Sequence, residues 1–259
     1  GVRLGLESGA LQAIRRGHHI GLRVLYLNKS GAELAILPTN ELGGSVMSNI
    51  IIAPPNIREL HLQVTGKSGL ICHHFGEKSR KQIEDTQGKV AKGPKEARNP
   101  KAEYEGAFYK LEGGGYGFPC AGFKKSAIRA AKLLDGVNMT DARQMFFVEA
   151  DDRDMTGVDC VRIECEGEPV MRTDTVRLAK GANDLRYRPE FRKWSCTLKI
   201  SFDQDLISSS QLVNLFLRAG SQVGVGDWRP ERDGQFGRFT VGEQTVLETG
   251  LETEVKKAA

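Results

Sequence analysis

Long hydrophobic runs are missing from this chain of 259 residues, although hydrophobic types make up 39% of it. A membrane-spanning helix needs roughly 20 consecutive apolar residues, and the one compact apolar run, residues 50–53, stops at Pro54. The N-terminal region also lacks the uninterrupted apolar core of a signal peptide, because Arg15, Arg16 and Arg23 break it. The sequence therefore predicts no transmembrane helix, and we expect a cytoplasmic protein.

Cysteine is sparse and odd in number, with 5 residues at irregular spacings. Such a set does not suit a disulfide framework, so we expect free thiols in a reducing compartment. Cys72, His73 and His74 are zinc-binding types, but neighbouring side chains of a strand point to opposite faces, and no second Cys/His pair accompanies them. The sequence therefore predicts neither a metal site nor a cofactor.

The net charge of +4 is too small to indicate a partner by itself. Basic residues nevertheless concentrate in two segments, 78–101 and 172–199, and acidic residues concentrate in 149–168. Two basic blocks suit a polyanionic partner. Two solvated faces that are balanced by an acidic loop explain the same distribution without a ligand.

Alternating apolar and polar residues indicate strands. Residues 57–65 and 194–202 alternate with a period of two, which is typical of strands with one buried face. A further strand is expected at 236–241, after the last helical segment.

Apolar residues at helical spacing indicate two amphipathic helices. The first covers residues 121–134, and lysine and arginine occupy its other faces. The second opens with Ser208 and Gln211, the spacing of a capping box, and we expect Gly220 to end it.

The order of these elements predicts the fold class. Strand, helix and strands, followed by strand, helix and strand, form two βαβ halves. We therefore expect an α+β protein with a ferredoxin-like or RRM-like (split βαβ) antiparallel sheet as its core. Long charged insertions are expected at 76–112, beginning with a helix at 77–86, and at 149–190.

Met47 resembles a translation start, because Gly43 and Gly44 can be encoded by codons that form a ribosome-binding site upstream of it. We expect residues 1–46 to be a leader or a short extension, residues 47–245 to form a single domain and residues 246–259 to form a flexible tail.

The most unusual segment is the glycine-rich loop, residues 224–238, between the second amphipathic helix and the last strand. Glycine lets backbone N–H groups approach a phosphate, arginine supplies charge-assisted hydrogen bonds and Trp228 offers a stacking face. A tight structural loop with Trp228 in the core explains the same residues. The candidate nucleic-acid contacts in the loop are Gly224, Gly226, Trp228, Arg229, Arg232, Gly234, Gly237 and Arg238.

A second candidate segment, residues 186–194, interleaves aromatic residues with four basic ones. Arg186, Arg188 and Arg192 are the candidate phosphate contacts in this segment. An exposed β-hairpin in which Tyr187 packs against Trp194 accounts for the pattern equally well.

The sequence offers only incomplete sets of candidate catalytic residues. Asp151, Asp152 and Asp154 have the oxygen chemistry that binds Mg²⁺ in a nuclease, but no second carboxylate set or candidate base accompanies them. No Gly-x-Ser-x-Gly elbow occurs either. The sequence therefore favours a protein that is not an enzyme.

Two motifs resemble the RAMP superfamily, the RRM-like backbone subunits of CRISPR effector complexes. They are the segment 118–129, a Pro/small-residue turn that opens a basic helix, and the glycine-rich loop with its ending Gly237-Arg238-Phe239. The resemblance implies single-stranded RNA bound along the subunit and copies placed side by side in a filament. It also implies that Lys124, Lys125 and Arg129 face the strand, together with Arg229, Arg232 and Arg238.

The chain departs from the usual family loop by inserting residues 227–233, so DNA stays open as the ligand. The segment 47–259 also resembles uncharacterised proteins of bacteriophages and prophages, which implies a bacterial host cell.

Together these observations predict non-enzymatic binding of single-stranded RNA or DNA by a homo-oligomer or filament. A phage structural or assembly subunit that acts through protein contacts is the first alternative, and a metal-dependent nuclease is the second. Sequence preference, oligomeric state and membership of a larger complex are left open.

Overall fold

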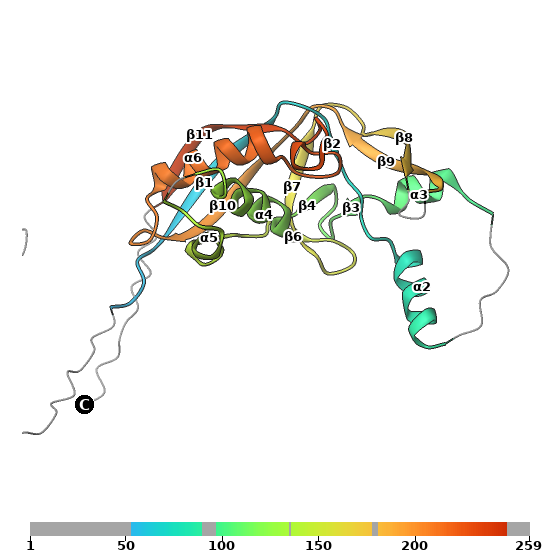
Figure 1. The fold of residues 1–259 in the computed structure, drawn as a ribbon, viewed down its shortest axis with the longest axis horizontal. Helices are drawn as coiled ribbons and strands as arrows, with labels where there is room; N and C mark the ends of the chain where they lie inside the picture. The colour runs from blue at the N-terminus through green and yellow to red at the C-terminus, as the bar shows by residue number, and fades with distance from the viewer. Residues whose placement is uncertain (1–52, 90–96, 135, 178–180, 248–259) are drawn as a thin grey trace, which may run out of the picture. The chain divides into compact units, whose positions relative to one another are not determined.

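The computed structural model (Figure 1) describes residues 53–89, 97–134, 136–177 and 181–247, which belong to a compact unit beginning at Ala53. The expected leader, residues 1–46, lies outside the described residues, as does the expected tail beyond Leu247. None of the helices in these ranges is long and apolar enough to cross a membrane.

The core is a large antiparallel sheet. Its central strands are β1 (Ile57–Gly66) and β10 (Trp194–Asp203), which confirms both strands that alternation predicted. The other strands follow the order β11-β1-β10-β7-β4-β3, while β5 pairs with β10 and β6 with β7. Their bounds are β3 (Tyr109–Lys110), β4 (Tyr116–Pro119), β5 (Phe146–Val148), β6 (Asp152–Arg153), β7 (Asp159–Cys165) and β11 (Phe239–Leu247). The predicted α+β class with an antiparallel sheet is thus confirmed.

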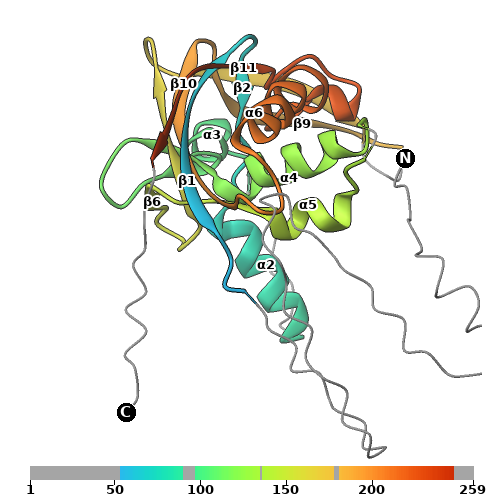
Figure 2. The same cartoon turned by 90° about the vertical axis from the view of Figure 1, so that its left-hand side faces the viewer.

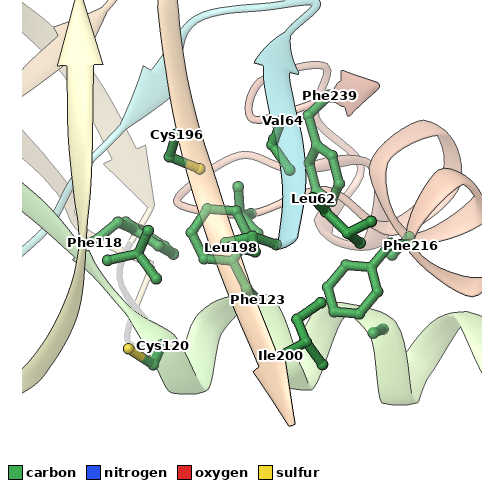
Figure 3. Packing of buried hydrophobic residues seen from close by; sticks show 14 of the residues in the cluster. Leu62, Val64, Phe118, Cys120, Phe123, Cys196, Leu198, Ile200, Phe216 and Phe239 are labelled. Carbon is green, nitrogen blue, oxygen red and sulfur yellow. The ribbon is translucent and has the colours of Figure 1, made fainter. Parts of the chain in front are cut away.

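Three helices cover one face of this sheet, as Figure 2 shows. They are α4 (Cys120–Ala131), α5 (Met139–Met145) and α6 (Ser209–Arg218). Phe123 of α4 and Phe216 of α6 point into the space above β1 and β10 (Figure 3), and both are fully buried. Burial of each phenyl ring contributes about 1.5–3 kcal/mol relative to leaving it exposed. The apolar stripes of the two helices therefore hold them on the sheet.

A second, smaller sheet lies beside the first and has the strand order β2-β9-β8. Its strands are β2 (Leu70–Ile71), β8 (Val170–Arg177) and β9 (Asn183–Phe191). Two helices occur in the expected first insertion: α2 (Glu77–Gln87), which confirms the helix predicted at 77–86, and α3 (Pro100–Gly106). The expected second insertion, residues 149–190, also contains β7, which pairs with β4 and β10 of the main sheet.

Some element boundaries differ from those predicted. α4 ends at Ala131 instead of residue 134, and β11 begins at Phe239 instead of residue 236. The delay in β11 has a physical cause, because the N–H of Gly237 is used by a carbonyl outside the sheet, that of Gly69 (2.8 Å).

Gly220 does not end α6 as expected. The helix continues into a π-helical turn, η1 (Ala219–Val223), and the chain leaves it at Gly224, whose φ is 74°. A Cβ at Gly220 would lie 2.2 Å from the carbonyl oxygen of Phe239. Glycine is therefore required there for close approach to β11, not for a helix cap.

The predicted capping box of α6 is confirmed. The Ser208 hydroxyl accepts a hydrogen bond from the Gln211 N–H, and the Gln211 side chain accepts one from the Ser208 N–H.

Replacing Ser208 by alanine is expected to lower the free energy of unfolding by about 1 kcal/mol, measured by urea denaturation. Ser209→Ala is the control and should change it by less. An unchanged unfolding midpoint in Ser208→Ala would show that the cap does not stabilise the helix.

Candidate functional site

The glycine-rich loop connects η1 to β11 and is closed by its own backbone. Val225 donates to the carbonyl of Gly237 (2.9 Å), and Gly234 donates to that of Arg229 (3.1 Å). A short 3₁₀ turn, η2 (Pro230–Arg232), forms its middle. The loop is also attached to the second sheet, because the N–H of Asp227 donates to the carbonyl of Ile71 in β2 (3.0 Å).

The glycines of this loop serve its folding. A Cβ at Gly237, whose φ is 65°, would lie 1.6 Å from the carbonyl oxygen of Val225, and one at Gly234 would lie 1.8 Å from that of Trp228. The N–H groups of Gly224, Gly234 and Gly237 donate to carbonyls of the protein. These three amides are therefore not free to cradle a phosphate, which corrects the role that their sequence pattern suggested.

A hollow with a volume of about 270 Å³ lies between α4 and the glycine-rich loop. We call it the basic hollow. Lys125 and Arg129 line it from α4, and Arg229 lines it from the loop. Gly224 and Gly226 also border it, so five of the candidate residues, from two segments far apart in sequence, meet at one place.

Two carboxylates, Glu231 and Asp227, line the hollow beside these cations. Oε2 of Glu231 accepts a hydrogen bond from Nε of Arg229 (3.0 Å) and lies 2.9 Å from Nη2 of the same arginine. Oε1 of Glu231 forms an ion pair with Arg129. Burial, followed by the positive charges of Arg129 and Arg232, lowers the pKa of Arg229. Within the described ranges, Lys125 is exposed and no ion pair or hydrogen bond of its ammonium group is found. The three cations that line the hollow thus outnumber its two carboxylates.

Arg188 lies in an enclosed ion-pair network. Its guanidinium contacts Asp174 at 2.7 Å and Asp227 at 2.6 Å, and its side chain is only 4% exposed. Burial raises the pKa of Asp227, but hydrogen bonds from His73 and Arg188 outweigh it, so this pKa is lowered overall. Arg188 is thus engaged by two carboxylates and joins β8, β9 and the glycine-rich loop, which makes it a positioning residue instead of the phosphate contact that we expected.

Trp228 is partly exposed, and two arginines contact its ring. It has a φ of 51°, and 36% of the residue is exposed. The guanidinium groups of Arg172 and Arg188 lie 5.5 Å and 5.4 Å from its ring centroid. These arginines hold the ring in place while part of it faces solvent.

A larger hollow of about 690 Å³ lies beside the β8–β9 hairpin and is lined by Arg186, Tyr187 and Arg98. His73 borders both hollows. Its Nδ1 lies 3.1 Å from Asp227, and its Nε2 lies 3.3 Å from a guanidinium nitrogen of Arg186. Arg186 therefore reaches the edge of the basic hollow through His73.

The remaining candidates lie apart from the basic hollow. Lys124 is placed over the ring of Phe147 (3.7 Å), and burial lowers its pKa. Arg192 is exposed in the turn between β9 and β10, and Tyr187 contacts Arg98 (5.5 Å) instead of Trp194, which is buried. Arg232 and Arg238 are exposed residues of the loop, and neither lines the basic hollow.

The acidic cluster at 151–154 is occupied by protein groups. Asp154 accepts hydrogen bonds from Thr156 and Val158 and lies 3.1 Å from His74. Asp152 accepts the N–H of Gly113, and Asp151 pairs with Lys199. In the part of the chain that the structure describes, no group of three or more metal-ligating side chains gathers. The carboxylates thus stabilise turns.

The cysteines are free thiols, and four of the five are buried. Burial raises the pKa of Cys120 and of Cys160 to about 12 in each case. Both therefore stay protonated near neutral pH.

Sequence reasoning missed two residues of the site. The sequence marks His73 as a zinc-binding residue type, and no local pattern indicates its approach to Asp227, which lies 154 positions further along the chain. Glu231 stands two residues from Arg229, a spacing that indicates a local ion pair, but its second partner, Arg129, follows only from the tertiary structure.

Comparisons with known proteins give little. No protein-family model matches the chain, and no curated protein matches its sequence. Among solved structures, the chain is similar to Cmr6 from Pyrococcus furiosus, with 10% identity, a TM-score of 0.34 and coverage of 71% of this chain and 98% of that one.

Proposed function

We propose that this protein binds single-stranded nucleic acid, without cleaving it, in the basic hollow. The observation that carries the proposal is the meeting of Lys125 and Arg129 of α4 with Arg229 of the glycine-rich loop around one hollow. Arginine binds phosphate oxygens through paired N–H groups, and lysine adds a point charge. Three such cations from two rigid elements suit the backbone of a nucleic acid.

An exposed aromatic ring in the glycine-rich loop favours a single strand. Trp228 is not among the residues that line the basic hollow, but it follows Asp227 and precedes Arg229, which do line it. Trp228, in the same loop, is 36% exposed. Aromatic rings that face solvent beside a cationic groove stack unpaired bases, which a duplex does not offer.

The sheet order supports the finer fold assignment. The chain order β1, α4, β5, β10, α6, β11 gives the spatial order β11-β1-β10-β5, and every neighbouring pair is antiparallel. We propose that this is the split βαβ arrangement of a ferredoxin-like core. Assembly of copies along the strand, the RAMP relationship, the phage origin and the cytoplasmic location stay predictions from the sequence.

Binding is expected to depend steeply on salt. If three cations neutralise three phosphates, the logarithm of the binding constant should fall against log salt with a slope of roughly −2, at about −0.7 per phosphate for single strands. Fluorescence anisotropy with labelled single-stranded RNA, single-stranded DNA and duplex DNA, each at several salt concentrations, measures this slope.

We expect both single strands to bind more tightly than the duplex of equal length. Absence of binding to all three probes at low salt would contradict the proposal. A salt-independent affinity would contradict it equally, because the phosphate contacts would then be missing.

A further inference from the structure

Arg129 and Arg229 reach the same point from two elements. Arg129 lies in the last turn of α4, whose opposite face is packed in the core. Arg229 precedes η2, and its Nη1 donates to the carbonyl of Gly226 (3.0 Å). The fold therefore fixes the backbone of Arg129 and the guanidinium group of Arg229, and both guanidinium groups reach Glu231.

The group between them is a carboxylate of the same loop. Glu231 offers one oxygen to Arg129 and the other to Arg229. The remaining nearby carboxylate, Asp227, is bound by Arg188 and His73. Within the described residues, Glu231 is thus the acidic partner that both arginines share.

We infer that Arg129 and Arg229 form a phosphate subsite that Glu231 occupies in the free protein, and that a bound phosphate displaces the Glu231 carboxylate. The inference deepens the proposed function and rests on it for the source of the phosphate. Carboxylate and phosphate oxygens bind arginine through the same paired N–H geometry. The free protein thus holds an internal anion where the backbone of the ligand would lie.

Solvent reaches both ion pairs of Glu231. The side chains of Glu231 and Arg229 are each 24% exposed and that of Arg129 is 37% exposed, so water screens the attraction that holds the carboxylate. Glu231 lies on the three-residue turn η2, so its side chain can rotate into solvent without unfolding a longer element. A phosphate in the hollow would also interact with Lys125, which lines it. Among the described residues, Glu231 forms ion pairs with Arg129 and Arg229 but not with Lys125.

The test is Glu231→Gln, which removes the internal anion and keeps the size of the side chain. We expect single-stranded RNA to bind about threefold to tenfold more tightly, because the competing carboxylate and its repulsion of the phosphate are both removed. Glu166→Gln is the matched control: it makes the same charge change and breaks an ion pair with Lys193, whose side chain is 74% exposed. A thermal melt verifies that each variant is folded.

A second arm uses inorganic phosphate as the probe, followed by phosphorus NMR line broadening. If Glu231→Gln tightens phosphate binding while neither protein binds RNA, the subsite stands and the proposed function fails. If it tightens RNA binding, and Arg129→Ala abolishes the gain in the same background, both stand. If Glu231→Gln and Glu166→Gln behave alike with both probes, the inference is overturned.

Discussion

Replacing Arg229 and Arg232 together by alanine is expected to weaken binding of single-stranded oligonucleotides by roughly a hundredfold. A hydrogen bond to a charged group contributes about 1.5–3 kcal/mol, and about 1.4 kcal/mol corresponds to a factor of ten in affinity. Arg229 lines the basic hollow and supplies most of the loss. Arg232, which is exposed and contributes long-range charge, supplies the rest.

The matched control is Arg143→Ala with Arg153→Ala, which removes the same two charges from exposed positions that do not line the basic hollow. Its effect should stay within a few fold. The salt slope of the loop variant should also become shallower by roughly 0.7 for each phosphate that the variant no longer neutralises. Equal losses of affinity in the two double variants would mean that the loop is only one part of a diffuse basic surface.

Replacing Arg188 by alanine is expected to lower the free energy of unfolding by about 3–5 kcal/mol, because one partner of a buried ion pair is removed. The change leaves Asp174, whose side chain is 4% exposed, without the guanidinium group of Arg188. Asp227 also loses Arg188 and keeps His73 as its side-chain partner. Urea denaturation monitored by circular dichroism measures the loss.

Arg192→Ala is the control, since Arg192 is exposed in the next turn and should change stability by less than about 0.5 kcal/mol. If Arg188→Ala leaves the unfolding midpoint in place and abolishes binding instead, Arg188 contacts the ligand directly. That outcome would return Arg188 to the role that the sequence alone suggested.

The parts of the fold that sequence predicted are those set by local chemistry. Alternation over β1 and β10 requires only that one sheet face be buried, and Leu60, Leu62 and Val64 are indeed fully buried. The capping box at Ser208 joins residues three positions apart. By contrast, β7 depends on pairing with the distant strands β4 and β10. The β8–β9 hairpin pairs locally, but it carries many charged residues at exposed positions, so its composition resembles that of a loop.

The candidate site was predicted only in outline, for a related reason. Sequence indicates where glycine and arginine gather, but it does not tell whether an amide faces a ligand or a carbonyl of its own loop. Gly234 and Gly237 face carbonyls. Likewise, Arg188 and Arg229 belong to equally basic motifs, yet tertiary packing encloses the first and places the second on a hollow.

Photochemical cross-linking tests the central claim most directly. Single-stranded RNA with 4-thiouridine at every third position would be irradiated with the full-length chain, and the cross-linked peptides identified by mass spectrometry. We predict cross-links in α4, at residues 120–131, and in the glycine-rich loop, with the strongest at Trp228, and none of them in Arg229→Ala with Arg232→Ala at equal concentration. Cross-links confined to other segments, or unchanged in that variant, would contradict the basic hollow as the nucleic-acid interface.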